Sequence, residues 1–199
     1  FLPNIDPVPL ANPISADMGV MRPSLLPGLV KTYLYNQNRQ QSRVRLFETG
    51  RRFIGSVDAL TDLDQQEQIS GLIAGSRDSE AWYHNAEKVD FYDLKAHVES
   101  LFALNDGGKP TYERSECEFL HPGRSADIFV DGQFVGLMGE LHPQLSKELG
   151  ANQPVYVFDI ALSAVLNATL PEYKAVSRFP EVRRDLALLV DRSVPVSEL

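Results

Sequence analysis

Two stretches decide the fold of this chain: Met21-Arg22-Pro23-Ser24-Leu25-Leu26-Pro27-Gly28-Leu29-Val30 and, a helix length later, Arg45-Leu46-Phe47-Glu48-Thr49-Gly50-Arg51-Arg52-Phe53. In the first, Pro27 falls in the first turn of a helix, where its missing N–H leaves no hydrogen bond unmade. Apolar side chains recur at helical spacing through Leu34, which predicts a helix ending near residues 39–42. In the second, charged and apolar residues alternate, as on a strand with two different faces. The sequence therefore predicts a helix followed by a partly polar strand.

The rest of the chain continues with helices and strands. We expect strands at 69–74, 111–116, 126–130, 134–139 and 155–160, a long helix at 89–102, and short helical segments at 143–149 and 161–166. Polar loops are expected at 55–66 and 76–87, and Asp131-Gly132 is a strong signal for a hairpin turn. Helices packed against a mostly antiparallel sheet make an α+β domain. We expect this domain to cover residues 1–170, and residues 171–199 to form a linker and, at 184–191, the first strand of a second domain.

Composition limits what the chain can be. With 199 residues, 43% of them hydrophobic, it can bury one full core. A net charge of −8 argues against a protein that coats nucleic acid. The single cysteine forbids an internal disulfide and is typical of a reducing compartment. No apolar run approaches the ~18 residues that span a bilayer, and no signal-peptide pattern opens the chain. We therefore expect a cytoplasmic chain without a membrane partner and, because both ends look cut, a piece of a longer protein.

The first helix and strand locally reverse this acidic charge. Their basic residues, opposed by the single acid Glu48, are Lys31, Arg39, Arg43, Arg45, Arg51 and Arg52. In so acidic a chain such a cluster could bind phosphate or an acidic partner surface. A solvated helix end and strand face is the plainer interpretation, because charge runs usually have that origin. The candidate contacts with RNA or phosphate are Arg39, Arg43, Arg51 and Arg52.

The sequence offers little evidence of an active site. His121 and His142 each precede a proline, which indicates a turn or strand boundary, and with Asp127 and Glu140 they match no metal-ligand spacing. Cys117 lies between two acids, which would raise its pKa and reduce its reactivity. Phosphate-binding glycine motifs and a nucleophile elbow are absent. We therefore assign no catalytic, cofactor-binding or metal-binding residue.

Several separated segments resemble, in order, the core of the beta subunit of bacterial phenylalanyl-tRNA synthetase. Besides the two opening stretches, they are Asn12-Pro13-Ile14-Ser15, Val89-Asp90-Phe91-Tyr92-Asp93-Leu94-Lys95, Leu120-His121-Pro122-Gly123-Arg124-Ser125-Ala126, Gly139-Glu140-Leu141-His142-Pro143 and Val155-Tyr156-Val157-Phe158. Any one would be weak evidence, but together they span most of the chain. Residues 177–187 resemble the opening strand of that subunit's C-terminal, ferredoxin-like anticodon-binding domain.

The resemblance implies a fold and a set of partners. The fold is a class II aminoacyl-tRNA synthetase-like antiparallel sheet flanked by helices. The partner is the alpha subunit, which binds ATP and phenylalanine in an assembly of two alpha and two beta chains acting on tRNA(Phe) with magnesium. A class II catalytic domain needs a glycine-rich strand and helix ending in arginine to hold nucleotide phosphates. The corresponding residues 158–166 contain neither glycine nor arginine, so we expect a catalytically silent part of the ligase.

The resemblance also suggests where the alpha subunit would dock. The expected interface combines the apolar helix face with neighbouring strand residues: Leu26, Leu29, Tyr33, Arg45 and Phe47. The same helix face can instead serve the chain's own core, as most apolar helix stripes do.

Two other functions stay open at this point. One is an RNA-binding module. The other is a free-standing enzyme of class II synthetase-like fold that binds nucleotide through Arg39, Arg45, Glu48 and Arg51.

Overall fold

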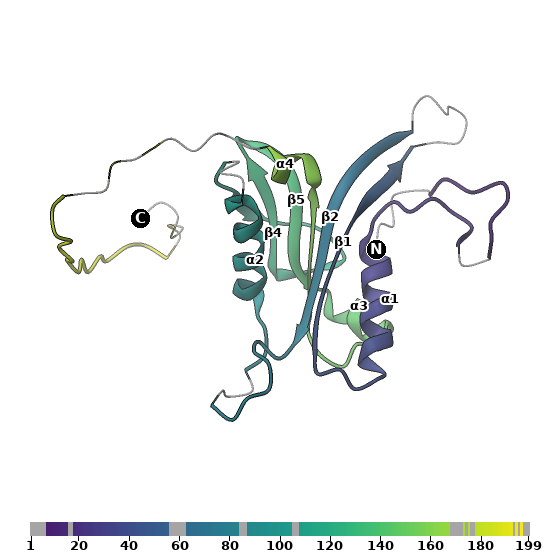
Figure 1. Ribbon diagram of the computed structural model, residues 1–199, viewed down its shortest axis with the longest axis horizontal. Coiled ribbons are helices and arrows are strands. Elements are labelled where there is room, and N and C mark those ends of the chain that lie inside the picture. Colours follow the sequence, from purple (N-terminus) through teal and green to yellow (C-terminus); the bar gives the residue numbers. More distant parts are fainter. Residues whose placement is uncertain are drawn as a thin grey trace.

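The computed structural model describes residues 7–15, 18–55, 63–83, 87–104, 108–167, 173, 175, 178–192, 194 and 196. Its elements in chain order are α1 (Leu26–Gln37), β1 (Arg43–Ile54), β2 (Asp64–Gly75), α2 (Phe91–Ala103), β3 (Thr111–Arg114), β4 (Leu120–Val130), β5 (Gln133–Leu141), α3 (Pro143–Glu148), β6 (Val155–Ala161) and α4 (Leu162–Leu166). The strands form one six-stranded sheet in the order β1-β2-β6-β5-β4-β3, and all neighbours are antiparallel. An α+β domain with an antiparallel sheet flanked by helices is thus confirmed (Figure 1).

Helices cover both faces of this sheet. Helices α1 and α3 lie on one face, and α2 and α4 lie on the other (Figure 1). Because neighbouring residues of a strand point to opposite faces, β2 sends Leu72 to the α1 side and Ile73 to the α2 side. The central strand β6 is buried on both faces, which explains its unbroken apolar sequence. No helix in the described part of the chain is long and apolar enough to cross a membrane.

Local signals in the sequence set where both long helices begin. At α1, the hydroxyl of Ser24 accepts a hydrogen bond from the backbone N–H of Leu26 at 3.1 Å, and a proline occupies the first turn. At α2, the carboxylate of Asp90 accepts from the N–H groups of Tyr92 and Asp93, while Asp93 accepts from the N–H of Asp90. This reciprocal capping box satisfies N–H groups that the first helical turn leaves without partners.

The turn between β4 and β5 is the one that the sequence predicts. Asp131 and Gly132 have φ angles of 50° and 76°. A two-residue turn with both residues in the left-handed region matches the twist of the flanking strands, and glycine and aspartate tolerate that region best. The hairpin is therefore confirmed.

Two strands begin five or six residues before their predicted starts. Strand β2 begins at Asp64 rather than residue 69, so the described end of the expected loop 55–66 belongs to the sheet; residues 56–62 lie outside the described residues. There Gln66 pairs with Arg52 and Glu67 with Arg51, so polar side chains bond across the strands and hide the apolar alternation. Strand β4 begins at Leu120 rather than residue 126.

Residues 184–191, expected to be the first strand of a second domain, form no strand in this structure, and Leu186 and Leu189 are fully exposed or nearly so. A strand needs a neighbouring strand to receive its backbone hydrogen bonds, and residues 184–190 take part in no strand pairing within the described part of the chain. Half of the expected linker, 171–180, lies outside the described residues. The domain boundary near residue 170 stays a prediction.

Candidate functional site

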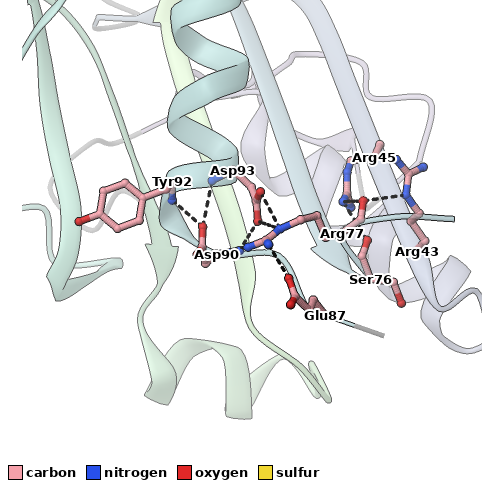
Figure 2. Close-up of polar contacts among 8 residues, drawn as sticks. All are labelled: Arg43, Arg45, Ser76, Arg77, Glu87, Asp90, Tyr92 and Asp93. Atoms are coloured by element: carbon pink, nitrogen blue, oxygen red, sulfur yellow. Dashed lines mark hydrogen bonds and ion pairs between the residues drawn. The ribbon is translucent and has the colours of Figure 1, made fainter. Parts of the chain in front are cut away.

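Arg45 joins the start of β1 to the end of β2 by donating to backbone carbonyls. One terminal nitrogen of its guanidinium donates to the carbonyl of Ala74 at 3.0 Å, and the other donates to that of Ser76 at 2.9 Å and that of Arg77 at 3.3 Å. Burial of the guanidinium, reinforced by nearby Arg43, lowers the pKa of Arg45 from its ordinary value. Figure 2 shows both arginines directed at the same turn. The donors of Arg45 are thus used within the domain.

Arg77 lies just past β2 and draws three carboxylates together (Figure 2). Its guanidinium lies 2.9 Å from Asp93, 2.6 Å from Glu87 and 3.5 Å from Asp90. The hydrogen bond to Asp93 is the main reason that the pKa of Arg77 is raised. Because Asp90 and Asp93 also cap α2, Arg77 holds the start of that helix beside the end of β2. With Arg43 and Arg45, the cluster balances three cations against three acids.

The four arginines expected to contact RNA or phosphate do not form one site. Arg39 lies over the ring of Tyr35, 3.3 Å from its centroid, at the end of α1. The other three lie along β1, where Arg43 donates to the carbonyl of Arg77, Arg51 pairs with Glu67, and Arg52 with Gln66. Positions 43 and 52 are separated by roughly 30 Å of extended strand. The structure thus places Arg43 with Arg45 at the start of β1, Arg51 and Arg52 near its other end, and Arg39 on the segment after α1.

Glu48 pairs with an arginine that precedes the first helix. Arg22 lies 2.5 Å from the carboxylate of Glu48, and it also donates to the carbonyl of Arg51 at 3.0 Å. A Cβ atom at Gly50 would lie 2.2 Å from the guanidinium of Arg22, so glycine leaves this side chain the room to cross the strand. The acid that the sequence places within the basic cluster therefore has its own partner.

Strand β1 forms one edge of the sheet and leaves part of its backbone open. Near its end, the N–H of Phe53 donates to the carbonyl of Arg22 at 2.9 Å, so it points away from β2. The N–H and C=O groups of alternate residues in an antiparallel ladder point the same way, which directs those of Arg45, Phe47 and Thr49 away from β2 as well. The side chain of Phe47 is 76% exposed. Among the described residues, an apolar ring thus lies beside a row of backbone donors and acceptors that no strand pairs with.

The residues expected at a subunit interface fall into two groups. The helix residues Leu26, Leu29 and Tyr33 are 1%, 5% and 0% exposed, and they pack in the core beneath α1. Their side chains thus serve the chain's own core, the alternative that the sequence left open. Of the two strand residues, Arg45 bonds to carbonyls, and only Phe47 presents its side chain to solvent.

Asp159 is a buried acid that sequence reasoning did not single out. It lies in β6 and is 9% exposed, and the hydroxyl of Ser70 donates to it at 2.6 Å. Burial is the main cause of the raised pKa of its carboxyl. The sequence did contain a signal for this buried acid, because Asp159 is a charged residue within the apolar run of a central strand.

A cavity of about 500 Å³ opens beside the start of α2. Its described lining includes Tyr92, Arg124 and Tyr156. The guanidinium of Arg124 lies 2.7 Å from the buried carboxylate of Glu140. Burial, with help from Glu140, raises the pKa of Tyr156 to about 12. Arg124, the cation among these lining residues, is thus already neutralised by a carboxylate.

The histidines and the cysteine have structural surroundings. Nδ1 of His121 accepts from the N–H of Gly123, and Nδ1 of His142 accepts from the N–H of Gln144 at the start of α3. Within the described residues, no three histidine, cysteine or acidic side chains gather as metal ligands would. The pKa of Cys117 is raised, as expected, although burial rather than neighbouring acids is its main cause.

Fold and site together define a class of protein. It is an α+β sheet domain in which charged side chains pair with one another and the edge strand β1 has β2 as its one neighbour among the described strands. Residues 2–162 match the family model described as the phenylalanyl tRNA synthetase beta chain CLM domain. The chain therefore belongs to the phenylalanyl-tRNA synthetase beta chain family.

The similar proteins are phenylalanine–tRNA ligase beta subunits that are much longer than this chain. The chain is 49% identical over 200 residues to the phenylalanine–tRNA ligase beta subunit of Pseudomonas fluorescens, 46% over 198 residues to that of Haemophilus influenzae, and 42% over 197 residues to that of Hahella chejuensis. These matches cover 99–100% of this chain but 24–25% of the relatives. The chain thus spans about a quarter of the length of the curated relatives it matches.

Proposed function

We propose that this chain is a catalytically silent, class II synthetase-like core of a phenylalanine–tRNA ligase beta subunit. It docks the alpha subunit, which carries the catalytic site, in a cytoplasmic assembly of two alpha and two beta chains. That assembly attaches phenylalanine to tRNA(Phe) with ATP and magnesium. The observation that carries the proposal is the open edge of β1 beside an exposed Phe47, in a family whose members are named as one subunit of a ligase.

The edge of β1 suits a protein partner. An unpaired strand edge can accept a strand from another chain, and the backbone groups then supply affinity while side chains supply specificity. Phe47 would provide the apolar contact, because aromatic residues contribute strongly at interface centres. The hydrogen bond from Phe53 to Arg22 closes the far end of the edge. Docking is therefore expected over the part of β1 before Gly50.

Catalytic silence is supported by how the charged groups are used. Glu48 pairs with Arg22, Arg51 with Glu67, and Arg45 with carbonyls. Gripping a triphosphate requires donors that converge on one point, whereas these side chains diverge. The same dispersion argues against the free-standing nucleotide-binding enzyme. It also disfavours an independent RNA-binding module, since no continuous basic surface remains along β1.

Two measurements on the purified chain test the proposal. Mixed with an alpha subunit of the same family, it should give a complex larger than either component in analytical ultracentrifugation. Calorimetry with ATP and magnesium should show no binding at micromolar concentration. Micromolar ATP binding, or adenylate synthesis by the chain alone, would overturn catalytic silence. Failure to associate with the alpha subunit would overturn docking.

A further inference from the structure

The connection between β2 and α2 carries an unusually exposed pair of aromatic residues. We call residues 76–83 and 87–88 the aromatic loop. Trp82, the only tryptophan of the chain, is 96% exposed, and its neighbour Tyr83 is 67% exposed. Their rings meet edge to face with centroids 5.5 Å apart. Figure 1 shows the chain that follows β2 projecting from the end of the sheet. Trp82 thus exposes its large apolar surface to water.

The base of the aromatic loop is firmly held. Its two ends pair through the bridge between Ser76 and Lys88, and the N–H of Arg77 donates to the carbonyl of Glu87 at 2.8 Å. The side chain of Arg77 adds ion pairs with Glu87, within the loop, and with Asp90 and Asp93 at the start of α2 (Figure 2). Because the base of the loop is already fixed, less conformational entropy is lost when Trp82 and Tyr83, at the tip of the loop, bind a partner.

The charge of the tip indicates what kind of partner it fits. Between residues 78 and 83 the charged side chains are the acids Asp78 and Glu80. Acids beside an exposed tryptophan disfavour a polyanion such as RNA, because binding to phosphates relies on lysine and arginine. The same acids favour a protein surface whose apolar pocket is bordered by basic side chains.

The loop is also continuous with the proposed docking edge. Arg45 of β1 donates to the carbonyl of Arg77 at the loop base. Phe47 follows two positions along, on the same face of β1 as Arg45. A partner that covers Phe47 therefore lies on the same strand face as Arg45, whose guanidinium bonds to the base of the aromatic loop.

We propose that Trp82 inserts into an apolar pocket with a basic rim on the alpha subunit, so that the aromatic loop is a second anchor of the docking surface. This inference rests on the proposed function, because it takes the alpha subunit as the partner. Tryptophan is the residue most enriched among side chains that dominate interface energies, and Glu80, the acid two residues before Trp82, would meet the basic rim.

The test compares variants of this chain for affinity to the alpha subunit. Trp82→Ala should weaken binding by about tenfold or more, and Trp82→Phe should weaken it less, since a smaller ring fills part of the pocket. Glu80→Lys should weaken binding and make it less sensitive to salt. Tyr92→Ala is the matched control, because Tyr92 is 73% exposed but lies on α2, and its affinity should stay within twofold of the parent. Circular dichroism checks that each variant is folded.

A second readout follows Trp82 itself. With 5-fluorotryptophan incorporated, this chain has one ¹⁹F resonance, which should shift when unlabelled alpha subunit is added. An unchanged resonance, or an unchanged affinity of Trp82→Ala while the complex still forms, overturns the inference and leaves the proposed docking intact. A loss of tRNA affinity without loss of alpha-subunit affinity also overturns it. If the parent chain forms no complex, both proposals fail.

Discussion

At Asp159 a carboxyl is held inside the sheet by hydroxyl groups rather than by a close salt bridge. Ser70 donates to it from the neighbouring strand, 89 positions away in the sequence, and Ser24 adds a further hydrogen bond. A buried carboxylate loses hydration that these hydrogen bonds do not fully replace. The sequence reveals the acid within an apolar strand, but its partner could not be identified because strand register brings the two residues together.

The raised pKa of Asp159 predicts how stability depends on pH. In the folded chain the carboxyl binds its proton more tightly than in the unfolded chain. As pH rises above the pKa of the unfolded state, the unfolded chain ionises first, so the folded state loses stability. This loss continues until pH passes the higher pKa of the folded state, above which it stays constant. Asp159→Asn cannot ionise and can still accept from Ser70.

The stability of Asp159→Asn relative to the parent should therefore increase as pH rises through this window and then level off. Urea unfolding at several pH values measures the difference in free energy of unfolding. A difference that is constant with pH, or that moves toward the parent as pH rises, would contradict this account.

Elements with a clear periodicity could be predicted from sequence, whereas their polar extensions could not. Helix α1 and the hairpin at Asp131-Gly132 follow from apolar spacing and turn chemistry alone. The first half of β2 does not, because Gln66 and Glu67 are stabilised by partners on β1. The Arg77 cluster was missed for a similar reason: it depends on how the loop after β2 meets the start of α2.

Two glycines give a prediction at the level of elements. Gly28 lies on the exposed side of α1, and a Cβ there would meet nothing closer than 3.8 Å. Gly136 lies in β5, where a Cβ would lie 2.3 Å from the carbonyl oxygen of Asp159. Gly28→Ala should stabilise the chain by about 0.5 kcal/mol through helix propensity, and Gly136→Ala should destabilise it by about 1–3 kcal/mol.

Chemical denaturation of both variants measures these effects, and each serves as the control for the other. If both substitutions change the free energy of unfolding by a similar small amount, then β5 and β6 do not approach as closely as described.

For the whole molecule, the main consequence of the fold is an asymmetry between the two edges of the sheet. Strand β3 closes one edge with four residues, whereas β1 presents twelve at the other. Long open edges invite pairing with another chain, and natural proteins usually shorten or cover them. In the described part of the chain, Arg22 covers the end of β1 near Phe53 and leaves the rest of this edge without a strand partner. The remaining open edge, with Phe47 and the aromatic loop at its base, is the basis for the proposed docking.

Hydrogen–deuterium exchange of this chain with and without the alpha subunit tests that docking most directly. The amides of Arg45, Phe47 and Thr49 point away from β2, so a docked strand should slow their exchange by about tenfold or more. The amide of Phe53, already bonded to Arg22, is the internal reference and should change little. A complex that forms while these three amides exchange at their free rates would contradict the account.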